Sequence, residues 1–349
     1  MKESCYSITI KYTKLLLPTI GKRLSCREYN EGEMLLFCGM SREAADSSRL
    51  VKGIGFAILA TVLWSGNYIV ARALHKTVPP VSIAFFRWTV ATLILFPFAF
   101  QKMKEEWQAL RRHFGYLVIT AVSGVTLFNT LIYLGGRHTS ATNLALIGTT
   151  AAPIFVLLIT GLVLRQHLRL SQIAGAIICV LGILVLLSGG DLSRLEDFRL
   201  NRGDLFVTGA AFSFACYTVL VRRMPPGLSP LSFLFNIFFL GTLFLLPAYL
   251  LERAYGFHFE WNGTVLAVFA YLGIGASVMA FLLWNLSIKA IGSARTALFG
   301  NLIPLFSTIE AALILEEPFT TATGFSLGII LTGLIIANVP FRKRKAEFV

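Results

Sequence analysis

From Gly53 onward, the chain repeats apolar stretches of about twenty residues that are separated by short polar connections. An α-helix rises about 1.5 Å per residue, so each stretch can cross about 30 Å of hydrocarbon. Closely spaced helices in lipid must pack together, because their connections cannot leave backbone groups unpaired. The sequence therefore predicts an all-α integral membrane protein with ten transmembrane helices. The expected spans are roughly 53–74, 81–100, 115–135, 141–163, 172–189, 204–223, 230–251, 264–288, 294–314 and 322–340.

Composition supports a lipid environment. Hydrophobic residues make up 56% of the chain, charged residues only 14%, and the mean hydropathy is +0.72. Soluble domains usually carry about a quarter charged residues. The net charge of +13 does not indicate nucleic acid, because the Lys and Arg residues lie between apolar stretches and form no stripe. The expected partners are the lipid bilayer and a small-molecule substrate, and no nucleic acid.

The basic loop residues predict an orientation. One side of the membrane holds most of them, namely Arg111, Arg112, Arg165, Arg169, Arg222, Arg223 and the segment Arg342 to Lys345. The other side holds few, among them Lys76, Arg137 and Arg253. By the positive-inside rule, both termini are cytoplasmic, which requires an even number of spans. We expect a multi-pass protein of the cell (inner) membrane.

Both ends of the chain are polar. Residues 1–50 are mixed in charge, and we expect a disordered cytoplasmic tail, because their longest apolar stretch is too short to span. Met34 and Met40 stand just upstream of the first span, so an internal start would remove much of this tail. Residues 341–349 form a basic cytoplasmic tail.

The chain contains an internal repeat of about 150 residues. Sliding the sequence against itself aligns special residues in order: Gly53 with Gly203, Pro80 with Pro230, Ser82 with Ser232, Pro97 with Pro247, Pro153 with Pro304 and Gly182 with Gly333. This predicts two five-helix repeats, residues 51–190 and 203–340. Five is an odd number, so the second repeat enters the membrane from the opposite side. Such inverted repeats are typical of secondary transporters.

The sequence contains no pattern typical of an enzyme active site or of a metal site. The five Cys residues form no CxxC pair and have no His at ligand spacing, so we expect free thiols and no metal site. The five His residues are scattered, and no triad or paired carboxylates occur. The Gly-rich stretches lack a GK[ST] sequence, which excludes a nucleotide cradle. We expect no catalytic residues, no cofactor and no enzyme activity.

Two short motifs and two longer segments carry a family resemblance. The motifs are Leu63-Trp64-Ser65-Gly66-Asn67-Tyr68 and Phe85-Phe86-Arg87-Trp88, and the segments run from Ala145 through Pro153 to Gly182 and from Ala297 through Pro304 and Glu316-Glu317 to Gly333. They resemble the EamA branch of the drug/metabolite transporter superfamily. The resemblance implies ten helices, alternating access and small organic substrates, often amino acids or their relatives and frequently exported. One departure is Arg165-Gln166, which replaces the family's acidic residue after the fourth span.

Two ionisable residues lie deep in the predicted spans. A charge at mid-membrane costs about 2.5 to 3.5 kcal/mol on insertion scales, so each needs a reason. We expect Arg87 and Glu310 to face the bundle interior, close enough to interact. The alternative is that Arg87 extends outward while Glu310 sits in a wet vestibule. Glu310 is also the one candidate for proton coupling.

Polar uncharged residues suggest a substrate path. Amides, hydroxyls and phenols can hydrogen-bond a zwitterion, and Trp offers an apolar wall. The candidates are Trp64, Asn67, Asn129, Tyr133, Asn143, Thr149, Trp284, Asn285 and Asn301, with Asn285 as a possible gate. The alternative for each is a helix–helix contact. Pro153 and Pro304 would kink their helices, for gating or for packing.

These features together predict a secondary transporter. The resemblance implies that it exports a small organic metabolite, such as an amino acid or a related compound. The alternative is a lipid flippase or a membrane-embedded enzyme that acts on a lipid-linked substrate. The sequence leaves open whether the protein is a monomer or a homodimer.

Overall fold

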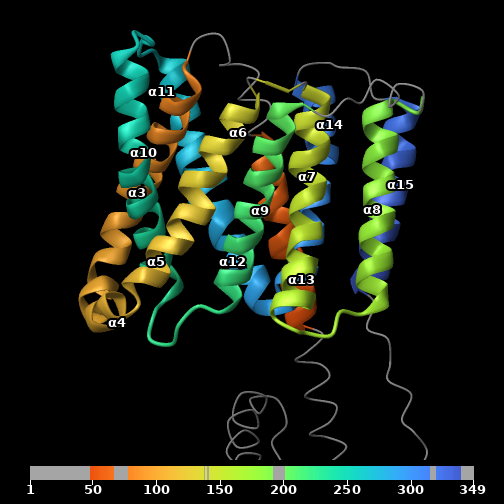
Figure 1. Cartoon of the computed structure of the whole chain (residues 1–349), viewed down its shortest axis with the longest axis horizontal. Coiled ribbons are helices and arrows are strands. Elements are labelled where there is room, and N and C mark those ends of the chain that lie inside the picture. The colour runs from red at the N-terminus through yellow and green to blue at the C-terminus, as the bar shows by residue number, and fades with distance from the viewer. Residues whose placement is uncertain are drawn as a thin grey trace, which may run out of the picture. The chain divides into compact units, whose positions relative to one another are not determined.

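In the computed structural model, every regular element of the described residues is a helix (Figure 1). The structure describes residues 48–66, 78–136, 138–139, 141–191, 201–314 and 320–338. The chain divides into residues 1–52 and 53–349, and the packing described below concerns the second unit. Nearly all of the predicted tail, and Asn67, lie outside the described residues.

The helices follow the predicted spans. The first described helix is Ser48–Gly66. The rest of the first repeat consists of α3 (Pro80–Glu105), α4 (Trp107–Arg112), α5 (Phe114–Ala121), η1 (Val122–Leu127), α6 (Phe128–Gly136), α7 (Ala141–Leu158), η2 (Ile159–Val163) and α8 (Leu170–Ser188). The second repeat consists of α9 (Arg202–Arg222), α10 (Pro230–Ala254), α11 (Gly263–Ala270), η4 (Tyr271–Met279), α12 (Ala280–Ile291), α13 (Ser293–Phe299), η5 (Gly300–Leu302), α14 (Ile303–Ile314) and α15 (Thr321–Asn338).

Among the described residues, eight helices are long and apolar enough to cross a membrane. The other two predicted spans are the fourth, where Ile147–Val163 is a shorter apolar helix, and the ninth, which a 3-10 turn, η5, divides into α13 and α14. These two contain the matched residues Pro153 and Pro304. Multiple spanning helices are thus confirmed, whereas the count of ten stays a prediction.

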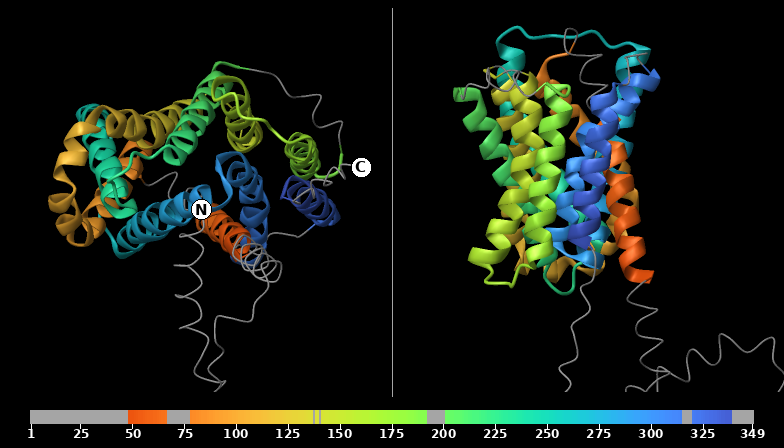
Figure 2. Two further views of the ribbon diagram at one scale, coloured as in Figure 1. Left: turned by 90° about the horizontal axis from the view of Figure 1, so that it is seen from below. Right: turned by 90° about the vertical axis from the view of Figure 1, so that its right-hand side faces the viewer.

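Matched helices of the two repeats pair with each other. In the described structure, α3 packs along α10, and α8 packs along α15 at the edge of the bundle (Figure 2). The hydroxyl oxygens of Thr92 and Thr242, exactly matched by the 150-residue shift, lie 3.4 Å apart. A residue meets its own counterpart only near a two-fold axis. This contact agrees with an inverted repeat.

Glycines allow the closest helix approaches. A Cβ on Gly175 would lie 2.5 Å from the carbonyl oxygen of Gly333, so α8 and α15 touch through their backbones. The Ser326 hydroxyl donates to the Gly182 carbonyl oxygen at 2.9 Å on the other side of the same contact. Small residues are the usual means of close packing in membranes. The matched pair Gly182 and Gly333 therefore lies in one interface.

A second matched pair of glycines stands near the start of the lead helix of each repeat. A Cβ on Gly53 would lie 2.5 Å from the Ile291 side chain, at the end of α12. A Cβ on Gly203 would lie 2.6 Å from the His138 carbonyl carbon, just beyond α6. The first helix of each repeat therefore packs against the end of the third helix of the other repeat.

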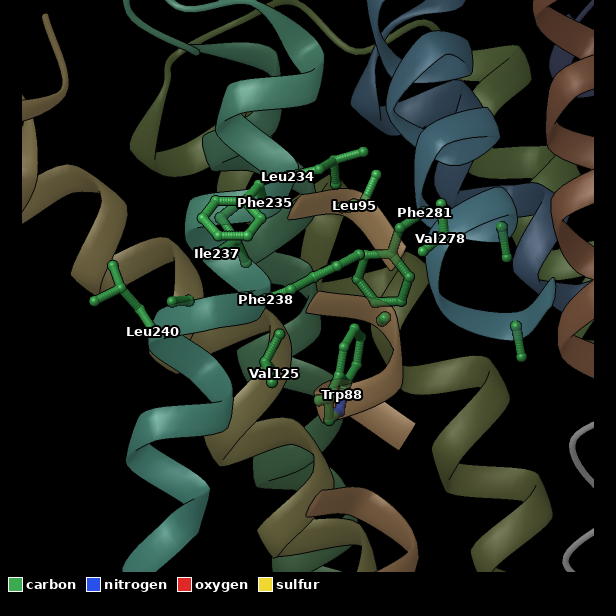
Figure 3. Packing of buried hydrophobic residues seen from close by; sticks show 14 of the residues in the cluster. Trp88, Leu95, Val125, Leu234, Phe235, Ile237, Phe238, Leu240, Val278 and Phe281 are labelled. Carbon is green, nitrogen blue, oxygen red and sulfur yellow. The ribbon is translucent and has the colours of Figure 1, made fainter. Parts of the chain in front are cut away.

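The largest core cluster joins the two repeats beside the cavity described below. Trp88 of α3, Phe238 of α10 and Phe281 of α12 are almost fully buried and meet in tilted and edge-on contacts (Figure 3). Ring centroids lie 4.8 to 5.6 Å apart, the favourable range for aromatic pairs. This cluster fixes the position of Arg87, the residue before Trp88.

Candidate functional site: a central cavity lined by both repeats

A cavity of about 110 Å³ lies among the helices of both repeats. Its wall consists of Trp64, Arg87, Trp88, Phe128, Gly148, Thr149, Ala152, Pro153, Val156, Phe214, Thr218, Phe281, Trp284, Ala297, Gly300 and Ile303. It is smaller than the roughly 150 Å³ engineered cavity known to hold benzene. In this conformation it admits only a compact molecule.

Aromatic rings form much of the wall. The Trp64 ring lies 4.9 Å from Trp284 and packs edge-on against Phe214 and Phe281, with centroids 5.7 and 5.5 Å away. The Trp64 indole nitrogen donates to the Ala276 carbonyl oxygen at 2.9 Å, which fixes the ring. The wall is thus rigid and largely apolar.

Arg87 is the charged residue of the wall and is only 6% exposed. Its Nε donates to Ser277 Oγ at 2.7 Å, and its Nη2 donates to the Ala276 carbonyl oxygen at 2.9 Å. Both acceptors belong to η4, a π-helix, and such segments often occur at functional sites. Arg87 therefore lies inside the bundle, and the alternative in which it extends outward is not what the structure shows.

Two hydroxyls complete the polar part of the wall. Thr149 of α7 and Thr218 of α9 are both buried. The Thr218 hydroxyl donates to the Phe214 carbonyl oxygen at 3.0 Å, which leaves its oxygen able to accept. No carboxylate occurs among the described residues that line the cavity. Its chemistry therefore suits a small molecule with a negative group and a compact apolar body.

Glu310 lies outside the cavity wall, on α14. Its Oε1 accepts a hydrogen bond of 2.6 Å from Ser65 Oγ, on the first described helix. The Tyr271 hydroxyl donates to the Leu63 carbonyl oxygen at 2.9 Å. Tyr271 also interacts electrostatically with both Glu310 and Arg87. A direct interaction between Arg87 and Glu310 stays a prediction.

The structure separates the predicted site residues into groups. Those in the cavity wall are Trp64, Arg87, Thr149 and Trp284. The side chains of Tyr133 and Asn143, like all of Asn67, lie outside the described part of the chain. A substrate-binding role for any of these residues stays a prediction.

Three predicted amides are buried but do not line the cavity. Asn129 donates to the Val125 carbonyl oxygen of its own helical segment. Asn285 accepts a 2.8 Å hydrogen bond from the Tyr217 hydroxyl of α9, and Asn301 lies against Cys179 of α8. In this conformation the polar contacts of these three amides are within the bundle, which is the helix-contact alternative. In a span that is apolar all round, the sequence does not show whether an amide faces the cavity or a neighbouring helix, and this explains why the three amides were predicted at the site.

Sequence reasoning missed most of the apolar wall, including Phe128, Phe214 and Phe281. The chain has 29 Phe residues, so a single one carries no signal. Trp88 could have been found, because it follows Arg87 directly. Pro153 does line the cavity, within a helix that continues past it, whereas Pro304 follows the 3-10 turn η5. A proline removes one helical hydrogen bond, which fits the interruption there.

Comparison with known proteins agrees with this architecture. A relative from Archaeoglobus fulgidus, named an uncharacterized transporter, is 30% identical over 76% of this chain and 91% of its own. A relative from Salmonella typhimurium, named a probable amino-acid metabolite efflux pump, is 25% identical over 83% of this chain and 95% of its own. A solved crystal structure superposes with a TM-score of 0.67 at 18% identity, covering 83% of this chain and 96% of that one, which shows a shared fold.

The family comparison matches each half of the chain separately. The EamA-like transporter family matches residues 51–188 and again residues 201–339. The two matches coincide with the two repeats and together cover most of the chain. The chain therefore belongs to the EamA-like transporter family.

Proposed function

We propose that this transporter exports a small organic metabolite, an amino acid or a related compound, by alternating access. The observation that carries the proposal is the cavity between the repeats, with Arg87 in an otherwise neutral and mostly aromatic wall. Transporter sites characteristically form where the two repeats meet. The inverted repeat supplies two near-equivalent arrangements that can exchange.

The wall offers a partner for each group of a small amino acid. A guanidinium binds a carboxylate through charge-assisted hydrogen bonds, so the substrate carboxylate belongs beside Arg87. The ammonium can meet the Thr149 and Thr218 hydroxyl oxygens and the faces of the aromatic rings. The small cavity favours a short side chain. The names of the Salmonella typhimurium and Escherichia coli relatives, both probable amino-acid metabolite efflux pumps, support this class.

Thermal unfolding of the purified protein tests the binding chemistry. A ligand that binds the folded state stabilises it by about 2.7 kcal/mol at one hundred times its Kd. We expect alanine and propionate to raise the melting temperature and ethylamine to leave it unchanged, because only the first two carry a carboxylate. Arg87→Gln should abolish both shifts, whereas Arg202→Gln, at an exposed residue outside the cavity, should retain them. A shift with phospholipids alone would favour the flippase or lipid-enzyme alternative.

Release from cells tests the direction. With both termini in the cytoplasm, as the basic loops predict, export carries substrate from the basic end of the bundle to the other. Cells loaded with alanine should lose it faster when they contain the wild-type protein than when they contain Arg87→Gln. Faster uptake without faster release would contradict export and leave the transporter assignment in place.

A further inference from the structure

The carboxylate of Glu310 is only half satisfied. Its Oε1 accepts the 2.6 Å hydrogen bond from Ser65, but its Oε2 is buried and has no hydrogen-bond partner among the described residues. An ionised oxygen that is buried without donors loses its hydration and gains nothing in return. The Ser65 hydroxyl has one proton and also lies 2.7 Å from the Val62 carbonyl oxygen, so it can donate there while a protonated Oε1 donates to Ser65 Oγ. A proton on Oε1 thus removes the negative charge and leaves the buried Oε2 as an uncharged carbonyl oxygen. The geometry around Glu310 is therefore that of a protonated carboxyl group.

A second donor stands within reach of the same oxygen. The position that a Cβ on Gly66 would occupy is 2.2 Å from the Tyr271 hydroxyl oxygen and 3.7 Å from Glu310 Oε2. The two oxygens are therefore no more than about 6 Å apart. The Tyr271 hydroxyl now donates to the Leu63 carbonyl oxygen. A small movement could turn it toward the carboxylate, because Gly66 has no side chain to block it.

Few other charges surround this group. The first helix supplies Ser65, η4 supplies Tyr271, and Arg87 of α3 acts electrostatically on Tyr271. The helices that pack on α14, namely α7 and α15, have no ionisable side chain. One carboxyl, one phenol and one guanidinium thus make up the described charged and titratable groups around Glu310.

We propose that Glu310 binds and releases a proton during the transport cycle, with Ser65 beside Oε1 in both states and Tyr271 as the added hydrogen-bond donor to Oε2 in the ionised state. In the present conformation the carboxyl carries the proton on Oε1, beside Ser65 Oγ. When that proton leaves for water, Oε2 becomes a charged acceptor and the Tyr271 hydroxyl turns to it from the Leu63 carbonyl oxygen. The hydrogen bond between the first helix and η4 then breaks, so the charge on Glu310 is linked to the contact between the two repeats. The transport part of this inference rests on the proposed function.

Infrared difference spectroscopy tests the protonation without any substrate. We expect purified wild-type protein at neutral pH to show the carbonyl stretch of a protonated carboxylic acid that disappears at alkaline pH. The band should be absent from Glu310→Gln and present in Glu260→Gln, a control at an exposed loop carboxylate. In Tyr271→Phe the band should persist to higher pH, because the ionised state loses its donor. A band that appears only with the surface carboxylates at acidic pH, or that survives in Glu310→Gln, would overturn the proposal.

Vesicles with a trapped pH dye test the link to transport. Adding alanine to wild-type proteoliposomes should change the internal pH, and Glu310→Gln proteoliposomes should show no such change. Alanine movement with no proton movement in the wild type would overturn the coupling while leaving the proposed function intact. If alanine neither binds nor moves, the proposed substrate class fails, and the infrared result still decides whether Glu310 holds a proton.

Discussion

At the residue scale, the absence of a side chain is as informative as its presence. On α15, Gly333 and Gly328 are five residues apart but meet different surroundings. A Cβ on Gly333 would lie 2.8 Å from the Cys179 sulfur and from the Gly175 carbonyl oxygen, whereas a Cβ on Gly328 would meet nothing within 4 Å. Backbone atoms cannot move aside as a flexible side chain can.

We therefore predict that Gly333→Ala destabilises the protein by about 1–3 kcal/mol, the usual cost of overpacking. Gly328→Ala on the same helix should be neutral or slightly stabilising, because alanine favours helix over glycine. Thermal unfolding of both variants in detergent measures the difference. Equal melting temperatures would contradict the close contact between α8 and α15.

The residue scale also shows what sequence can and cannot reveal. The match of Gly182 with Gly333 pointed to a shared role, and both residues lie in one interface. Arg87 could be selected because a charge in an apolar span is rare. The sequence could not show whether the predicted amides line the cavity or make helix contacts, because a span that is apolar all round gives no sign of which face meets the cavity. These amides are Asn129, Asn285 and Asn301.

At the scale of elements, a carboxylate at the end of each of α3 and α10 accepts hydrogen bonds from the start of the other helix. Glu252, near the end of α10, accepts from the Val81 nitrogen at 3.1 Å and from both the nitrogen and the hydroxyl of Ser82 at 2.7 Å. Glu106, just after α3, accepts from the Ser229 nitrogen at 2.9 Å at the start of α10. A negative charge at a helix N-terminus is stabilising. Each helix is thus capped by the end of its partner.

We predict that Glu252→Ala destabilises the protein by about 1.5–3 kcal/mol, the range for hydrogen bonds to a charged group. Glu252→Gln should cost less, because its amide oxygen can still accept. Glu260→Ala, at an exposed residue near by in the chain, provides the control. Denaturation in detergent compares the three. If all three unfold alike, Glu252 does not cap α3.

The π-helical segments lay beyond sequence prediction. The segments η1 and η4 occupy corresponding places in the two repeats, about 150 residues apart, yet both were expected as plain helix. A shift of hydrogen bonding from four to five residues leaves no mark in an apolar composition. The result matters for the site, because Ala276 of η4 accepts hydrogen bonds from both Trp64 and Arg87.

At the scale of the whole molecule, the repeat and the charge pattern together predict a topology. Two five-helix repeats would give ten spans, an even number, and would therefore place both termini on one side. We then expect the loop 164–169 and the connection 223–229 to share the cytoplasmic side with the termini, and the connection 255–262 to lie outside. The described helices alternate in direction as this scheme requires (Figure 1).

Labelling of single cysteines tests the topology directly. In a variant whose five native cysteines are replaced by serine, His167→Cys and Glu260→Cys each add one thiol at an exposed position. We predict that a maleimide unable to cross membranes labels the Glu260→Cys variant in intact cells, and labels the His167→Cys variant only after the membrane is opened. The reverse pattern would invert the orientation, and export would then carry the substrate toward the basic end of the bundle. Three predicted spans separate positions 167 and 260, and an odd number of spans places them on opposite sides of the membrane. Labelling of both positions in intact cells would therefore contradict the predicted topology.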